Sequence, residues 1–317
     1  MSITPRSLEG VTVATVLPFT DTLAIDWPSY ERLLAFCATP AEVSAVFVNG
    51  HAGEGATLTP EERLAVIRRT RAFIGDRKPL LTGLIGYATD EVVEQARAAE
   101  QAGVDVAVVF PMPQFGAGAS NDPRYVLDLV DAVLDATSLP VSIFQQSVAS
   151  GAGFSTEVLL ELARRERVIA LKEGSGDIGL YEDNLRRIKA IRPDLAILAS
   201  NYHWMFAQMA TGADGILSGM GSMVPGLLCE LWAASRAGDL RAMRAVNDRL
   251  YPLVRTIYGA PPLIDMHTRL KVGLQHLGII DSARPRRPLL DIPPAVARRI
   301  VQAVDTAGLG GLREGRP

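Results

Sequence analysis

The sequence predicts a (β/α)8 barrel followed by a C-terminal helical appendage. Short apolar runs alternate with longer amphipathic segments eight times within the first 237 residues. The apolar runs are nearly continuous, as in parallel strands that are covered on both faces. Eight repeats at this length favour a closed barrel, with an open doubly wound sheet as the alternative. We therefore expect a barrel over 1–237, an appendage over 238–307 and a tail over 308–317.

Each expected strand is a run of mostly Val, Ile, Leu or Ala, and Gly, Pro or charged residues bound most of the runs. The strands are expected at 11–17, 43–49, 79–84, 104–110, 141–144, 168–172, 195–199 and 212–218. Helices are expected after them at 27–38, 60–74, 90–102, 123–136, 156–165, 178–191, 203–210 and 225–237. The second helix has a clear start, because Thr59 offers a cap, Pro60 suits the first turn and two acids follow. Beyond residue 238 three helices are expected without strands between them, at 240–258, 264–277 and 294–307.

Composition excludes several classes of protein. Hydrophobic residues make up 48% and charged residues 21% of the chain, which is ordinary for a soluble globular enzyme. The formal net charge of −3 gives no electrostatic reason to bind nucleic acid or an anionic membrane. Two cysteines and four histidines show no metal-ligand spacing, so no metal is expected. Without a signal peptide or an apolar run of roughly 18 residues, we expect a cytoplasmic protein.

Lys172 is the first candidate for chemistry. In a barrel, catalytic groups lie at the carboxyl ends of the strands, and Lys172 ends the sixth expected strand. If its side chain points into the barrel, burial lowers its pKa and the neutral amine can form a Schiff base with a ketone. The alternative is a structural lysine whose stem packs on the sheet while its ammonium reaches water.

Two glycine-rich stretches also lie at strand ends. The sequence GHAGEG at 50–55 follows the second strand, and its backbone amides could face an anion or simply form a turn. The stretch 174–179 is a literal G-x-G-x-x-G, which raises a nicotinamide-binding alternative. That alternative is weak, because Asp194 precedes the next strand instead of ending it. After the fifth strand, Phe144 is most simply explained as a packing residue.

Taken together, these motifs resemble the dihydrodipicolinate synthase/N-acetylneuraminate lyase family of pyruvate-type class I aldolases. The likeness covers about 11–290. It includes LPF at 17–19, GHAGE at 50–54, LTPEER at 58–63, LKEGS at 171–175, GADGI at 212–216 and, near the C-terminus, Lys271, Gly278 and RPL at 287–289. The resemblance implies a barrel fold, a Schiff-base lysine at Lys172, no metal or organic cofactor, and a homodimer or homotetramer. It also implies substrate-binding positions at Gly50, His51, Ala52, Gly53, Gln146, Gly215 and Ile216.

Four positions depart from the family pattern. Phe144 stands where the family has a tyrosine, Ala52 replaces a threonine, and Pro113 replaces a tyrosine that many members supply to a neighbouring subunit. These three side chains have no proton to give. Ala149 stands where the synthase-type arginine would bind a second carboxylate. His51 adds an ionisable side chain to its loop, and it either replaces the missing acid–base group or is a solvated loop residue.

We therefore expect a Schiff-base lyase, an aldolase or dehydratase, acting on a 2-oxo acid such as pyruvate or a sugar-derived keto acid. A true dihydrodipicolinate synthase is not expected. The main alternative is a degenerate member that binds a small keto acid without turnover, and the second is a nicotinamide-dependent oxidoreductase. Specificity is expected from loops that include Gln145, Gln146, Asn201 and His203.

Overall fold

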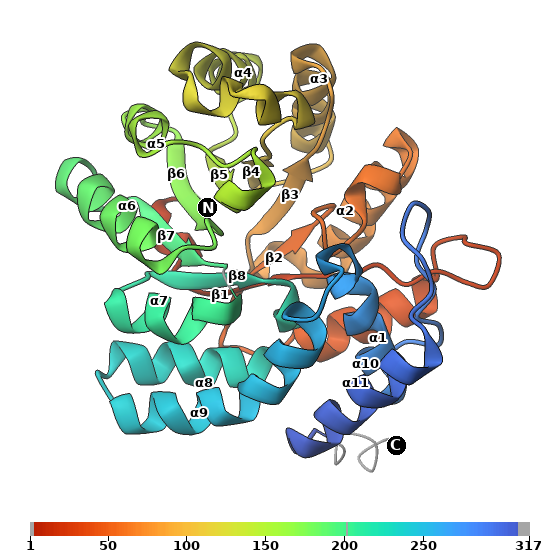
Figure 1. The fold of residues 1–317 in the computed structure, drawn as a ribbon. Helices are drawn as coiled ribbons and strands as arrows, with labels where there is room; N and C mark the ends of the chain where they lie inside the picture. The colour runs from red at the N-terminus through yellow and green to blue at the C-terminus, as the bar shows by residue number, and fades with distance from the viewer. Residues whose placement is uncertain (1–2, 201, 310–317) are drawn as a thin grey trace.

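The computed structural model describes residues 3–200 and 202–309, and its centre is a closed barrel of eight parallel strands in sequence order (Figure 1). The predicted fold class is confirmed. The barrel closes where β1 pairs with β8, with Gly10 opposite Gly215. The strands are β1 (Gly10–Ala14), β2 (Val43–Val48), β3 (Leu80–Leu84), β4 (Val106–Val109), β5 (Val141–Gln145), β6 (Val168–Glu173), β7 (Ala196–Ala199) and β8 (Gly215–Ser218).

In the part of the chain that the structure describes, α1 to α8 surround the barrel and cover the outward faces of the strands (Figure 1). They are α1 (Trp27–Cys37), α2 (Pro60–Ile74), α3 (Thr89–Gln101), α4 (Pro123–Ala136), α5 (Thr156–Ala163), α6 (Ile178–Ile191), α7 (Met205–Thr211) and α8 (Pro225–Arg236). The expected cap of α2 is present, since the Thr59 hydroxyl accepts from the Glu62 amide and the Glu62 carboxylate accepts from the Thr59 amide. Short 3-10 turns at Tyr202–Trp204 and Leu263–Asp265 precede helices where longer helices were expected.

Successive side chains along each strand point alternately into the barrel interior and toward the helix layer. On β6, Lys172 faces a cavity inside the barrel mouth, whereas Leu171 packs against Leu159 and Ile188 of the helix layer. Nearly every strand residue is buried, which explains why the strands read as continuous apolar runs.

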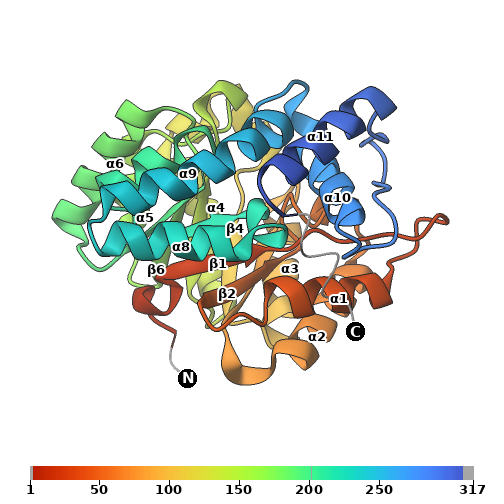
Figure 2. The same cartoon turned by 90° about the horizontal axis from the view of Figure 1, so that it is seen from below.

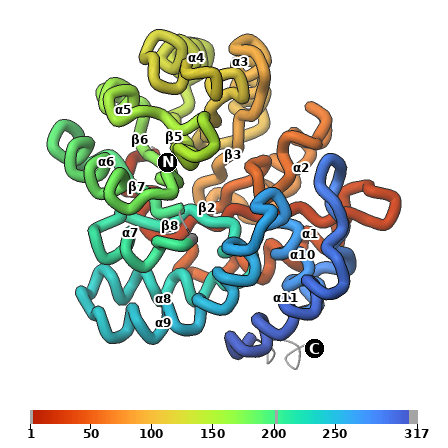
Figure 3. The backbone as a smooth tube through the Cα atoms, viewed as in Figure 1, coloured from red at the N-terminus to blue at the C-terminus, as the bar shows by residue number. Residues whose placement is uncertain are grey.

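Three more helices follow the barrel: α9 (Leu240–Leu253), α10 (Met266–His276) and α11 (Pro294–Thr306). Figure 2 shows α9 alongside α8, and Figure 3 shows the chain then crossing toward α1. An ion pair of 2.6 Å between Arg32 of α1 and Asp281 ties the segment after α10 to the barrel. The division into barrel and appendage at residue 237 stays a prediction, and the expected tail lies outside the described residues from 310 onward.

The expected single helix over 240–258 is divided in the structure. The α-helix ends at Leu253, and a π-helical turn over Val254–Tyr258 completes the segment. Pro252 lies within the last turn of α9, where it cannot donate a backbone hydrogen bond. Among the described residues, no helix is both long and apolar enough to cross a bilayer.

Candidate active site

A cavity of about 420 Å³ opens at the carboxyl ends of the strands, where catalytic groups of such barrels lie. Its walls come from strand ends, from the loops that follow β2, β5 and β6, and from the segment between α9 and α10. The lining residues used below are His51, Ala52, Phe144, Gln146, Lys172, Gly219, Tyr258 and His267. Lys172 is the only lysine or arginine among the described lining residues, and none of them is an aspartate or a glutamate.

Lys172 is nearly completely buried, with 6% of its surface exposed. Burial lowers its pKa from 10.5 to about 7. The Nζ atom lies 3.8 Å from the centre of the Phe144 ring and 5.6 Å from that of Phe47. These aromatic faces favour the ammonium by only about 0.5–2 kcal/mol, which is less than the desolvation that opposes it. At neutral pH about half of the Lys172 side chains therefore carry a free amine.

The next residue of β6, Glu173, points to the other face of the strand, toward the helix layer. Its side chain is completely buried, and the Gln208 Nε2 atom donates to its Oε2 at 3.2 Å. Burial raises the pKa of Glu173 to about 7. Because successive strand residues face opposite sides, this carboxyl group stays in the helix layer and does not neutralise the Lys172 ammonium inside the barrel.

Phe144, Phe110 and His51 form one aromatic cluster beside Lys172. Ring centres are 4.8 Å apart for Phe110 and Phe144, 4.9 Å for His51 and Phe110, and 5.7 Å for His51 and Phe144, all edge to face. Gly174 leaves room for this packing, because a Cβ atom there would lie 3.3 Å from the Phe144 ring. The cluster makes the floor around the amine apolar, which contributes to its desolvation.

His51 lines the cavity with part of the residue exposed to solvent, while its ring packs edge to face against Phe110 and Phe144. Desolvation and the nearby charge of Lys172 lower the pKa of His51 to about 4. The imidazole is therefore neutral at pH 7 and holds no extra proton. In the pH range around neutrality, Lys172 and not His51 is the cavity group that changes its protonation state.

The loop that carries His51 has a fixed backbone. Asn49 and Glu54 adopt left-handed conformations with φ of 56° and 52°. A Cβ atom on Gly50 would lie 2.6 Å from the Phe47 ring, so only glycine fits there. The Glu54 carboxylate, completely buried, forms an ion pair with Lys271 of α10 and accepts a 2.8 Å bond from the Arg286 amide. The C-terminal helices thus hold this loop at the cavity.

The structure brings most predicted site residues together. His51, Ala52, Phe144, Gln146 and Lys172 line one cavity, and Gly50 and Gly53 belong to the same loop. Gly215 and Ile216 do not line it. Ile216 pairs with Val11 and faces the helix layer, while a Cβ atom on Gly215 would meet the Gly10 backbone at 2.5 Å, at the opposite end of the strand.

Only some of the loop residues that were expected to determine specificity line the cavity. His203 and Gln146 line the cavity, whereas Gln145 is buried against the Phe154 backbone, accepting from its amide at 2.8 Å. Asn201 lies outside the described residues. The G-x-G-x-x-G stretch covers the loop after β6 and the first residues of α6 in a closed barrel, so it lacks the open-sheet context of a nicotinamide site.

Tyr258, His267 and Gly219 line the cavity and were missed by sequence reasoning. Tyr258 and His267 belong to the C-terminal segment, which was expected as a helical appendage without site residues assigned to it. The one local signal is that Tyr258 precedes Gly259 and a Pro-Pro pair, which marks the end of a helix without indicating a site. Among the described residues, no group of three or more His, Cys, Asp or Glu side chains could hold a metal ion.

The comparisons with known proteins all indicate the same protein family. The model of the dihydrodipicolinate synthetase family matches residues 7–306. A 4-hydroxy-tetrahydrodipicolinate synthase of Kineococcus radiotolerans is 30% identical over 96% of this chain and 94% of its own length. The enzyme of the same name from Protochlamydia amoebophila is 24% identical over 94% of this chain and 96% of its own length.

Solved structures show the same fold at low identity. A monomeric dihydrodipicolinate synthase variant superposes with a TM-score of 0.87 at 22% identity, covering 96% of this chain and 98% of that one. YagE, a prophage protein from E. coli K12 solved in complex with pyruvate, superposes with a TM-score of 0.85 at 21% identity, covering 95% of this chain and 99% of that one.

Proposed function

Because the chain belongs to the dihydrodipicolinate synthetase family, whose members are class I aldolase-type lyases, we propose that Lys172 forms a Schiff base with a 2-oxo acid. The proposed reaction is an aldol cleavage, an aldol addition or a dehydration. One observation carries the proposal: Lys172 is a buried amine at the floor of the cavity, with no carboxylate among the described lining residues to keep it charged.

The chemistry follows from this environment. The neutral Nζ atom attacks the ketone carbon, and loss of water from the resulting carbinolamine gives a protonated imine. The imine nitrogen then accepts the electron pair of a neighbouring C–C or C–H bond. No metal or organic cofactor is required for these steps. The apolar floor formed by Phe144, Phe47 and Phe110 favours the attacking amine because it destabilises the competing ammonium.

The loop after β2 is the proposed site for the carboxylate of the 2-oxo acid. Its backbone amides at His51 and Ala52 lie beside the cavity, and the left-handed conformation of Glu54 fixes the turn. Gln146 also lines the cavity and adds an uncharged hydrogen-bonding side chain. Pyruvate is also the ligand of the solved YagE complex.

We propose that the second substrate or leaving group is not a doubly charged amino-acid aldehyde. Ala149 stands where the synthase-type arginine would be, and the described lining offers no other cation besides Lys172 itself. Leu263 and Met266 instead add apolar surface to the cavity wall. The preferred substrate is therefore pyruvate or a sugar-derived keto acid. The second substrate or leaving group carries no charge where it meets the apolar wall of the cavity.

The competing function is a member that binds a keto acid without turnover. Phe144 favours it, because its ring occupies the site of the family tyrosine and has no proton to transfer. Turnover of any 2-oxo acid by the purified protein decides between the two functions.

The proposal is tested by incubating the protein with a panel of 2-oxo acids, adding borohydride and measuring the intact mass. A stable adduct with at least one acid is expected for the wild type and for Lys189→Ala, and none for Lys172→Ala. Lys189 is a matched control, because it forms a 2.7 Å ion pair with Asp214 outside the cavity. Absence of an adduct in the wild type with every acid would refute the proposed function.

We also propose a reducing, cytoplasmic compartment and a homo-oligomer. Both cysteines, Cys37 and Cys229, are buried free thiols, which suits a reducing compartment. The exposed Tyr87 and Tyr125 lie near the loop that follows β4, where an apolar surface could contact a second copy.

A further inference from the structure

Tyr258 lines the cavity from the side of the C-terminal helices. Only 1% of its surface is exposed, yet its side chain borders the same space as Lys172 and Phe144. A Cβ atom on Gly219, at the end of β8, would lie 3.0 Å from the Tyr258 hydroxyl oxygen and 3.3 Å from Nε2 of His267. Glycine at this position therefore leaves the room that the phenol and the imidazole occupy at the barrel mouth.

The backbone that carries Tyr258 is held by hydrogen bonds of its own segment. Tyr258 ends the π-helical turn, which the Gly259 amide closes by donating to the Val254 carbonyl at 2.8 Å. Such turns occur frequently at functional sites. They change the register of a helix, and here the turn replaces the last turns of the helix that was expected.

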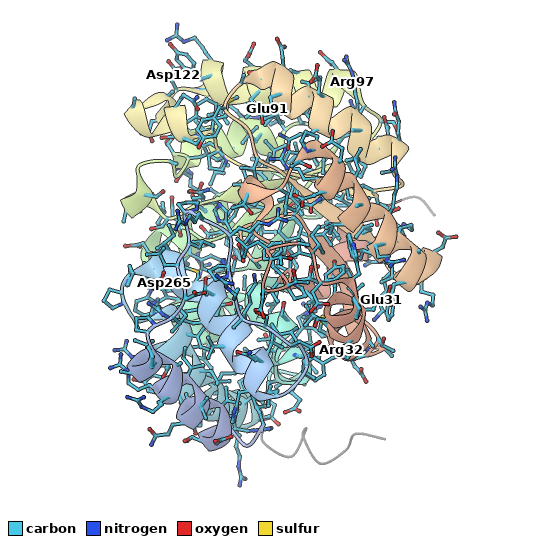
Figure 4. All side chains as sticks on the ribbon, turned by 90° about the vertical axis from the view of Figure 1, so that its right-hand side faces the viewer. Glu31, Arg32, Glu91, Arg97, Asp122 and Asp265 are labelled. Atoms are coloured by element: carbon cyan, nitrogen blue, oxygen red, sulfur yellow. The ribbon has the colours of Figure 1, made fainter. Side chains whose placement is uncertain are left out.

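A buried arginine also holds the segment around Tyr258. Arg269 of α10 is 1% exposed and donates to the carbonyls of Ile257 and Pro262, each at 3.0 Å, and to that of Ala260. Asp265, labelled among the C-terminal helices in Figure 4, lies 3.7 Å from the guanidinium. Burying a guanidinium is expensive, so its three bonds on either side of Tyr258 indicate a segment whose position is closely determined.

The phenol is the best-matched proton donor in the cavity. Phe144 has no hydroxyl. Burial is the largest cause that lowers the pKa values of His51, His203 and His267, that of His267 well below its usual value, so the three histidines in the described lining are neutral at pH 7. The other hydroxyls in the described lining are serines, whose alkoxides form far less readily than a phenolate. A tyrosine holds its proton at neutral pH, and its conjugate base is strong enough to remove a carbon-bound proton next to an imine.

We propose that Tyr258 is a catalytic residue that transfers protons to and from the Schiff-base intermediates on Lys172. As the carbinolamine C–O bond breaks, the Tyr258 hydroxyl gives its proton to the departing oxygen, so that water, a protonated imine and a phenolate result. The phenolate then removes a proton from C3 of the imine. The C–H electron pair forms the C=C bond of the enamine, the nitrogen recovers its lone pair, and Tyr258 regains its proton. This assignment rests on the proposed function, because it needs the Schiff base at Lys172.

The test measures exchange of the C3 hydrogens of pyruvate for deuterium by proton NMR in D2O, alongside borohydride trapping. Exchange needs no second substrate, so it reports the proposed proton transfer directly. Tyr258→Phe should still reach the borohydride adduct on long incubation, although more slowly, and should lose about 10²-fold or more of the exchange rate. Tyr181→Phe is the matched control, since Tyr181 is equally buried but donates to the Gln208 carbonyl at 3.1 Å in the helix layer. Its exchange rate should match the wild type.

A second variant protects the test against misfolding of Tyr258→Phe. Gly219→Ala adds the Cβ atom that would press on the Tyr258 hydroxyl, and it should slow exchange while the adduct persists. Wild-type exchange in folded Tyr258→Phe would overturn the proposal, and so would an unaltered rate in Gly219→Ala if Tyr258→Phe does not fold. A wild-type adduct without any C3 exchange would also overturn it. Absence of the adduct itself in the wild type would refute the proposed function instead.

Discussion

Replacing Lys172 by methionine should make the protein more stable at neutral pH, because the buried amine destabilises the fold. In the unfolded chain a lysine has its usual pKa of 10.5, whereas burial lowers the pKa of Lys172 to about 7. Each pH unit between the two values corresponds to about 1.4 kcal/mol, so keeping the amine costs about 4 kcal/mol at pH 7. Methionine has a similar shape and no charge, and we expect Lys172→Met to recover most of this free energy.

The pH dependence gives the sign of the effect. Between the two pKa values the unfolded chain binds more protons than the folded one, so the penalty from Lys172 decreases as pH rises. The gain in Lys172→Met should be largest below pH 7, about 4 kcal/mol at pH 7 and about 2 kcal/mol at pH 9. Urea unfolding of both proteins from pH 6 to pH 9 measures the difference.

A matched control variant shows whether the gain in stability is specific to Lys172 or follows from removing any lysine. Lys189→Met removes a partly exposed ion pair with Asp214 and should cost no more than about 1 kcal/mol at every pH. If Lys172→Met is no more stable than the wild type throughout the pH range, Lys172 is not desolvated and the argument for a neutral nucleophile fails.

Four further outcomes are expected. His51→Ala should lower turnover by about tenfold or less while borohydride trapping persists, because the neutral imidazole holds no extra proton and Tyr258 is the proposed proton carrier; a loss of about 10²-fold or more would make His51 the acid–base group instead. Lys271→Met should destabilise the protein by about 3–5 kcal/mol in urea unfolding, because it leaves the completely buried Glu54 carboxylate without its ion-pair partner, and a loss no larger than that of Lys189→Met would contradict this. Aspartate semialdehyde should give no condensation product with pyruvate in a coupled assay, and a product would show that the cavity binds a second carboxylate after all. Light scattering at micromolar concentration should show at least a dimer, which a monomer peak would rule out.

The fold could be predicted from the sequence because each β/α unit has a local signal. The apolar run and the glycine-bounded end of each strand are contiguous in sequence, and the Thr59 cap marks α2 within one residue. The error over 240–258 has a physical reason as well. Amphipathic periodicity continues through Tyr258, but the bond from Gly259 to Val254 forms only in the folded context.

Site residues could be predicted from the sequence only where they lie at or just after the end of an expected strand. Lys172 and His51 lie directly after apolar runs, so their place at the barrel mouth follows from topology. The substrate-binding role of Ile216 came only from the family resemblance and stays a prediction, since Ile216 is not among the described residues that line the cavity. Tyr258 and His267 come from a segment remote in sequence, and only tertiary packing brings them to Lys172.

The central claim is that Lys172 forms the Schiff base, and peptide mapping after reduction tests it most directly. The wild-type protein is treated with pyruvate and borohydride, digested, and analysed by tandem mass spectrometry. The account predicts one modified lysine, Lys172, with modification half-maximal near pH 7, where its amine becomes neutral. Modification at Lys189 or Lys271, with Lys172 unmodified, would contradict it.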